Sequence, residues 1–146
     1  MYSTIAVGSD GSDTAAIAVR AAIDIASRYG AKLLILGAHE SAAGASVMAA
    51  SAGVAIPADP DWEQSLDREV AGDLQPLIDE AAAAGVQAEL VVGSGPPAEV
   101  LCEVAESRNV DLLVVGSKGM KRKVLGSVPN TVTHKAPCSV LLVKTA

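Results

Sequence analysis

Short apolar runs alternate along the chain with longer segments in which apolar and polar residues recur at helical spacing. The apolar runs predict strands at residues 3–9, 32–38, 87–92, 111–115 and 139–144. The segments between them predict helices at residues 14–29, 62–84, 97–108 and 127–135. Because parallel strands are joined by crossover helices, this order favours an α/β fold, a single doubly wound parallel sheet with helices on both faces.

Two of the predicted helices carry features with structural consequences. In the first helix, Arg20, Asp24 and Arg28 are spaced four residues apart, which predicts ion pairs from Arg20 to Asp24 and from Asp24 to Arg28. In the second helix, Pro76 lacks the backbone N–H that a helix interior uses, which predicts a break or kink near residues 72–75.

The length of 146 residues fits one domain, residues 1–146, with one core. Within it, residues 40–61 are rich in Ala, Gly, Ser and Pro and predict a long flexible loop. No apolar run approaches the roughly 18 residues that a membrane helix needs, and the N-terminus has no signal-peptide pattern. Cys102 and Cys138 lack metal-type spacing, so we expect a reduced, cytoplasmic protein without membrane contact.

Charge is divided unevenly along the chain. Residues 1–111 hold 5 Lys/Arg and 17 Asp/Glu, whereas residues 112–146 hold 6 Lys/Arg and no acidic residue. Four of these six lie close together, at Lys118, Lys121, Arg122 and Lys123. This local positive charge favours a small anionic ligand, although basic loops also serve solubility. The net charge of −6 and the scarcity of aromatic residues disfavour nucleic acid as a partner.

The basic segment lies inside a glycine-rich pattern. Gly116 directly follows the strand predicted at residues 111–115, Gly119 comes three residues later, and Gly126 and Ser127 open the last predicted helix. Glycines allow backbone N–H groups to approach a phosphate, and a helix start favours an anion through its unpaired N–H groups. The pattern indicates a nucleotide-phosphate site. The alternative is a tight turn followed by a helix N-cap, without a ligand.

A second segment is expected to face this loop. In doubly wound sheets, ligands bind at the carboxyl ends of the strands, where the strand order reverses. If the first and fourth strands are neighbours, Gly8, Ser9 and Asp10 lie across a crevice from the segment that runs from Gly116 to Gly119. There the Asp10 carboxylate accepts hydrogen bonds from ribose hydroxyls or from an adenine amino group. Its alternative role is that of a turn or capping residue.

Other candidate sites are weaker. Residues 93–98 match the dinucleotide pattern G-x-G-x-x-A, but Pro96 and Pro97 lack the N–H groups that a pyrophosphate needs and are better explained as a helix start. His39 closes the second strand and His134 lies near a helix end, and neither has an identifiable nucleophile partner. The sequence therefore predicts a binding site without catalytic machinery.

Four segments together carry a resemblance to a known family. They are residues 5–12 (IAVGSDGS), 111–120 (DLLVVGSKGM), 125–128 (LGSV) and 136–143 (APCSVLLV). On these motifs the chain resembles the universal stress protein family over essentially its full length. The resemblance implies a five-stranded parallel sheet in the order 3-2-1-4-5, and a homodimer in which Ser139 to Lys144 pairs antiparallel with its mate. An apolar edge strand of this kind needs covering.

The family contains ATP-binding members with a G-x-x-G…G-[ST] motif and members without it, so the resemblance also implies roles for particular residues. Adenosine would contact Gly8, Ser9 and Asp10, and the adenine pocket would be lined by Ala38 and Val115. The phosphates would be held by Gly116, Gly119, Gly126, Ser127 and Val128. The implied function is a regulatory stress-response protein that binds ATP, with or without Mg²⁺, and is not an enzyme beyond weak ATP hydrolysis.

One departure from the family pattern bears on the ligand. Only six residues, Met120 to Leu125, separate the second and third glycines, fewer than in the ATP-binding members. The shortened loop leaves AMP or cyclic AMP open as the ligand, and also a nucleotide-free protein that acts through its dimer surface. Lys118, Lys121 and Arg122 are expected to offset backbone contacts that the shorter loop loses.

Overall fold

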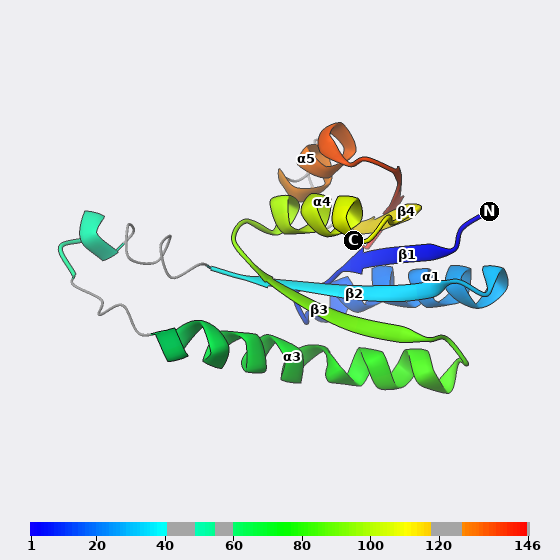
Figure 1. Ribbon diagram of the computed structural model, residues 1–146, viewed down its shortest axis with the longest axis horizontal. Coiled ribbons are helices and arrows are strands. Elements are labelled where there is room, and N and C mark those ends of the chain that lie inside the picture. Colours follow the sequence, from blue (N-terminus) through cyan, green and yellow to red (C-terminus); the bar gives the residue numbers. More distant parts are fainter. Residues whose placement is uncertain (41–48, 55–59, 118–126, 146) are drawn as a thin grey trace.

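A computed structural model describes residues 1–40, 49–54, 60–117 and 127–145. Within them, parallel strands form one five-stranded sheet in the order β3-β2-β1-β4-β5 (Figure 1). The strands are β1 (Thr4–Gly8), β2 (Lys32–His39), β3 (Ala88–Ser94), β4 (Leu112–Gly116) and β5 (Ser139–Val143). The predicted fold class and strand order are both confirmed.

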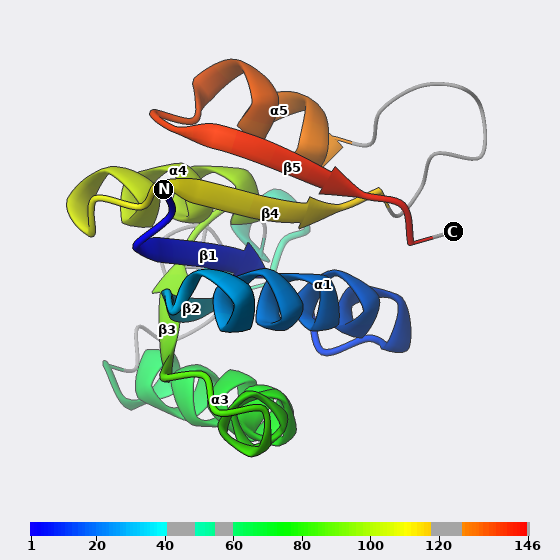
Figure 2. The same cartoon turned by 90° about the vertical axis from the view of Figure 1, so that its right-hand side faces the viewer.

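The helices of the described residues cover both faces of the sheet. They are α1 (Asp13–Tyr29), α3 (Pro60–Ala83), α4 (Pro97–Ser107) and α5 (Ser127–Lys135). Helices α1 and α3 lie on one face, and α4 and α5 lie on the other, as the two perpendicular views show (Figures 1 and 2). This layering explains the apolar runs, because a strand covered on both faces has no polar side.

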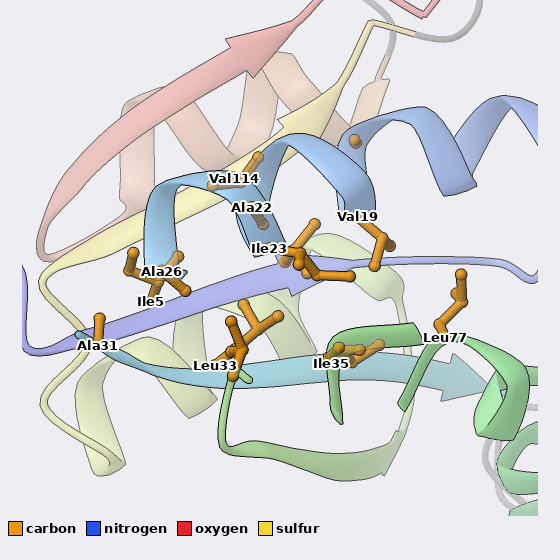
Figure 3. Packing of buried hydrophobic residues seen from close by; sticks show 14 of the residues in the cluster. Ile5, Val19, Ala22, Ile23, Ala26, Ala31, Leu33, Ile35, Leu77 and Val114 are labelled. Carbon is orange, nitrogen blue, oxygen red and sulfur yellow. The ribbon is translucent and has the colours of Figure 1, made fainter. Parts of the chain in front are cut away.

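Strand β2 shows how its side chains divide between the two cores. Leu33 and Ile35 pack under α1 and α3, while Leu34 and Leu36 point to the opposite face, beneath α4. All four are at most 1% exposed, and burying each contributes about 1.5–3 kcal/mol before the entropy of ordering the chain is counted. Figure 3 shows the first core, with Ile5, Leu33 and Ile35 of the sheet beneath Val19, Ala22 and Ile23 of α1.

Helix α3 runs without a break through Pro76, so the break predicted near residues 72–75 is wrong, and the alternative of a kink there stays a prediction. Pro76 is exposed, whereas Leu74, Leu77 and Ala81 on the same helix are buried against the sheet. An interior proline costs about 3 kcal/mol through its lost hydrogen bond and its ring. One leucine on each side of Pro76 is buried, and the burial of these two side chains offsets a cost of that size.

The predicted ion pairs of α1 are half right. Arg28 Nε lies 3.0 Å from Asp24 Oδ2 within the helix, but Arg20 Nε lies 2.7 Å from Glu80 Oε1 of α3. Because α1 and α3 cover the same face of the sheet, the neighbouring helix offers Arg20 a carboxylate that helical spacing alone does not reveal. The hydrogen bond to Glu80 and its charge raise the pKa of Arg20 above its usual value.

The predicted flexible loop at residues 40–61 lies partly outside the described residues. Its described part contains a helical turn at residues 49–51, and helix α3 already begins at Pro60. No helix in the described ranges is long and apolar enough to cross a bilayer.

Gly37 of β2 allows α3 to approach the sheet closely. A Cβ added to Gly37 would lie 2.5 Å from Val70 Cγ1 and 2.8 Å from Leu74 Cδ1. Both distances are too short for real carbon contacts, so α3 can pack here only against a residue without a side chain. Gly37 therefore sets the position of α3 at the carboxyl end of β2.

We expect Gly37→Ala to lower the free energy of unfolding by about 1–3 kcal/mol through overpacking against Val70. The double variant Gly37→Ala with Val70→Ala should regain part of this loss. Gly72→Ala is the matched control, because its added Cβ meets nothing within 4 Å and should stabilise the helix by roughly 0.5–1 kcal/mol. Urea unfolding measures all three, and equal stability of Gly37→Ala and wild type would contradict the packing argument.

Candidate functional site

The carboxyl ends of β1 and β4 meet at the centre of the sheet. Strand β1 pairs with β2 on one side and β4 on the other, with Ala6 opposite both Leu34 and Leu113. The chain order reverses at this point, where doubly wound sheets bind ligands. A cavity of about 270 Å³ opens there. The cavity is thus where the topology predicts a site.

The predicted site residues fall into two groups. The following all line the cavity: Gly8, Ser9, Asp10, Ala38, Val115, Gly116, Ser127 and Val128. The others lie outside the described residues: Lys118, Gly119, Lys121, Arg122 and Gly126. Gly8, Ser9 and Asp10 therefore share one cavity with Gly116, the first residue of the segment expected to face them.

Most of the cavity wall is aliphatic. Beyond the predicted residues it includes Leu36 from β2 and Pro97, Val100 and Leu101 from α4. Sequence reasoning missed these α4 residues because Val100 and Leu101 have the spacing of ordinary core positions. The available signal was that α4 starts directly after the carboxyl end of β3. Leu101 also contacts Gly8, where an added Cβ would lie 3.0 Å from Leu101 Cδ2.

Asp10 forms the turn between β1 and α1. Its Oδ1 atom accepts hydrogen bonds from the Ser12 backbone N–H at 3.0 Å and from Ser12 Oγ at 2.5 Å. Ser12 in turn caps α1 by accepting from the Ala15 N–H at 3.2 Å. The turn role considered for Asp10 is therefore present, and the same exposed carboxylate lines the cavity. These contacts hold the carboxylate in place before any ligand arrives.

The opposite end of the cavity is built from the ends of β4 and β5. Ser117 is 1% exposed; its N–H donates to Val143 O at 2.9 Å, and its Oγ accepts from the Thr145 N–H at 3.0 Å. Helix α5 begins beside them at Ser127. The first-turn N–H groups of a helix have no partners within the helix and favour an anion. This end of the cavity suits a negatively charged group.

Thr145 lines the cavity and was not predicted. The residue is 6% exposed, and its Oγ1 atom is buried and has no hydrogen-bond partner among the residues that the structure describes. A buried hydroxyl without a partner costs about 1–3 kcal/mol, and such groups are commonly satisfied by a ligand or a water. Thr145 thus brings a buried hydroxyl to the cavity wall, beside Gly116.

The two histidines and the two cysteines are not among the residues that line the described cavity. His39 Nε2 bonds Asp67 Oδ1 of α3, and His134 Nδ1 lies 2.8 Å from a carbonyl one turn earlier in α5. Burial raises the pKa of the Cys102 and Cys138 thiols, which are half-buried against the core on the face of the sheet that α4 and α5 cover. The described residues contain no group of three or more potential metal ligands. Among the described wall residues, Asp10 contributes the ionisable side chain.

Comparison with known proteins agrees with the fold. The sequence pattern of the universal stress protein family matches residues 1–144. Universal stress protein YxiE of Bacillus subtilis is 33% identical, over 99% of this chain and 100% of that protein, and Rv1636 of Mycobacterium tuberculosis is 34% identical, over 99% and 97%. A crystal structure of a universal stress protein in complex with cAMP matches with a TM-score of 0.75 and 33% identity, over 99% and 98%. The chain therefore belongs to the universal stress protein family.

Proposed function

We propose that this chain is a non-enzymatic regulatory protein of the stress response that binds an adenine nucleotide, with ATP as the expected ligand. The observation that carries the proposal is the single cavity shared by Gly8, Ser9 and Asp10 on one side and by Gly116 and Ser127 on the other. A similar protein, 33% identical, is known in complex with cAMP, which supports a ligand of this class.

The cavity offers a place for each part of a nucleotide. The adenine ring packs between Ala38 and Val115, because an apolar slot buries an aromatic ring without requiring aromatic partners. The ribose hydroxyls donate to Asp10. The phosphates lie at the start of α5, near Ser127. A Mg²⁺ ion would be carried mainly by the phosphates, as is usual for this ion.

Cyclic AMP is the second candidate ligand. The loop between Gly119 and Gly126 is short, and a cyclic nucleotide has one phosphate to place instead of three. The complex of the similar protein with cAMP favours this alternative over AMP. A nucleotide-free interaction protein is a further alternative, and extraction of freshly purified protein separates it from the others, because bound nucleotide would be released on denaturation.

We also propose that the protein is a homodimer joined through β5. Strand β5 pairs with β4 on one side only within the described residues. The side chains of Val140 to Val143 are half-buried and apolar, and an open edge of this kind is prone to pair with another strand. A second copy of the same strand provides a symmetric cover.

Calorimetric titration with ATP, with and without Mg²⁺, and with cAMP tests the binding proposal. We expect saturable binding of at least one of them. Thr145→Val should weaken it about 5- to 30-fold, because the variant keeps the shape of the side chain and removes its hydroxyl. Thr145→Ser keeps the hydroxyl and serves as the control. Absence of heat with every adenine nucleotide, together with nucleotide-free purified protein, would refute the proposal.

A further inference from the structure

The carboxyl end of β2 is tied to α3 by a buried histidine. His39 is the last residue of β2, and its side chain is 6% exposed. Its Nδ1 atom lies 2.9 Å from the backbone oxygen of Glu40, and its Nε2 atom lies 2.5 Å from Asp67 Oδ1. The histidine therefore spans from the end of the strand to the N-terminal half of α3.

Both partners of the His39 ring are hydrogen-bond acceptors. A carbonyl oxygen and a carboxylate can only accept, whereas a neutral imidazole has a single N–H to donate. Both hydrogen bonds form together only when the ring carries two protons and a positive charge. The geometry thus selects the imidazolium form of His39.

The charges around the ring act in the same direction. Burial by itself lowers the pKa of His39, but the hydrogen bonds to Glu40 O and Asp67 and the negative charges of Asp67 and Glu63 outweigh it, so the pKa is raised above its usual value. Gly93 and Ser94 of β3, which pair with the end of β2, carry no charge. Helix α3 therefore supplies the carboxylates that favour the proton.

The same residue is linked to the cavity wall through the backbone. His39 follows Ala38, which lines the cavity, and its carbonyl oxygen accepts from the Gly95 N–H at 2.8 Å. Gly95 leads into α4, whose first residue, Pro97, also lines the cavity. One histidine thus connects α3, the end of β2 and the turn before α4.

We propose that His39 is a positioning residue for the cavity: its imidazolium, held between Glu40 O and Asp67, fixes the end of β2 against α3 and keeps Ala38 in place for the adenine ring. This inference rests on the proposed nucleotide-binding function. Its consequence is proton-linked affinity, with tighter binding when the ring is charged and weaker binding when it is neutral.

The direction of the pH effect follows from the raised pKa. The stabilisation that the charged ring contributes is fully present below its unfolded-state pKa, near 6.5. It is lost as the pH rises through the higher, folded-state pKa. Nucleotide affinity should decline only as the pH rises past the raised folded-state pKa, because the ring of the ligand-free protein keeps its proton below that value.

The test compares pH profiles of affinity from pH 5.5 to 9 in wild type, His39→Gln and Asp67→Asn. Cyclic AMP is the preferred probe, because its phosphodiester keeps a constant charge across this range; with ATP, the titration of the phosphate is common to all variants. We expect wild-type affinity to fall at least about fivefold toward high pH. His39→Gln should remove this dependence, and Asp67→Asn should move it to lower pH. His134→Gln, which alters the exposed histidine of α5, is the control and should leave the profile unchanged.

A readout in the ligand-free protein separates this inference from the proposed function. NMR titration of the His39 ring should give a pKa above 6.5 that falls in Asp67→Asn. If no nucleotide binds at any pH, the proposed function and the positioning role both fail. The ring titration then reports only whether the His39 ring between Glu40 O and Asp67 is charged. If a nucleotide binds with the same pH profile in wild type and His39→Gln, the positioning role fails and the proposed function stands. The Asp67 side chain is 53% exposed, so we expect Asp67→Asn to give a folded variant even if His39→Gln does not.

Discussion

Ala38→Phe is expected to lower nucleotide affinity at least about 100-fold, equivalent to roughly 2.7 kcal/mol of binding free energy. Ala38 lies at the carboxyl end of β2, only partly buried, with its side chain on the cavity wall beside Leu36 and Val115. A phenyl ring at this position would occupy the slot proposed for adenine. Because the change extends into a cavity and not into a filled core, the fold should survive it. Calorimetry with the nucleotide that wild type binds measures the effect.

The control for this prediction is Ala82→Phe, which makes the same change on the exposed surface of α3, away from the cavity. The nucleotide affinity of Ala82→Phe should equal that of wild type. Both variants should unfold cooperatively, with melting temperatures within a few degrees of the wild-type value. Full nucleotide binding by Ala38→Phe would place the adenine ring elsewhere and would remove the main support for the proposed orientation.

The fold was predictable because its signals are local and agree with one another. The apolar run at Lys32–His39 is continuous, as a strand buried on both faces requires, and Gly30 ends the preceding helix in the left-handed conformation, with φ of 62°. The predictions that failed are those that depend on tertiary contacts. The course of α3 through Pro76 is decided by Leu74 and Leu77 on the sheet, and no window of sequence around the proline contains that contact.

The site was predictable where backbone chemistry defines it and not where packing does. Gly8 and Gly116 are visible in the sequence because close backbone approach needs glycine, and Asp10 is visible because it follows a strand. Val100 and Thr145 look like an ordinary core residue and an ordinary polar residue until the strand order brings them to one cavity. A histidine at the end of a strand likewise gives no sign of its partner.

Val140→Pro is expected to convert the proposed dimer into a monomer at micromolar concentration. The Ser117 N–H donates to Val143 O at 2.9 Å, so the backbone polar groups of Val143 face β4. Because backbone direction alternates along a strand, Leu141 also faces β4, while Val140 and Leu142 direct their N–H and C=O groups to the open edge. A proline at position 140 removes an outward N–H and leaves the inward hydrogen bonds to β4 in place. Sedimentation equilibrium measures the change in mass.

Val140→Ala is the matched control, because it removes side-chain packing against the core beneath α4 and keeps the outward N–H. If the dimer is held by main-chain hydrogen bonds between two copies of β5, the alanine variant remains dimeric and only the proline variant dissociates. A wild type that is monomeric at these concentrations would exclude the edge pairing. A proline variant that stays dimeric would place the interface elsewhere, since strand pairing at an edge cannot lose one of its outward donors without a large fall in affinity.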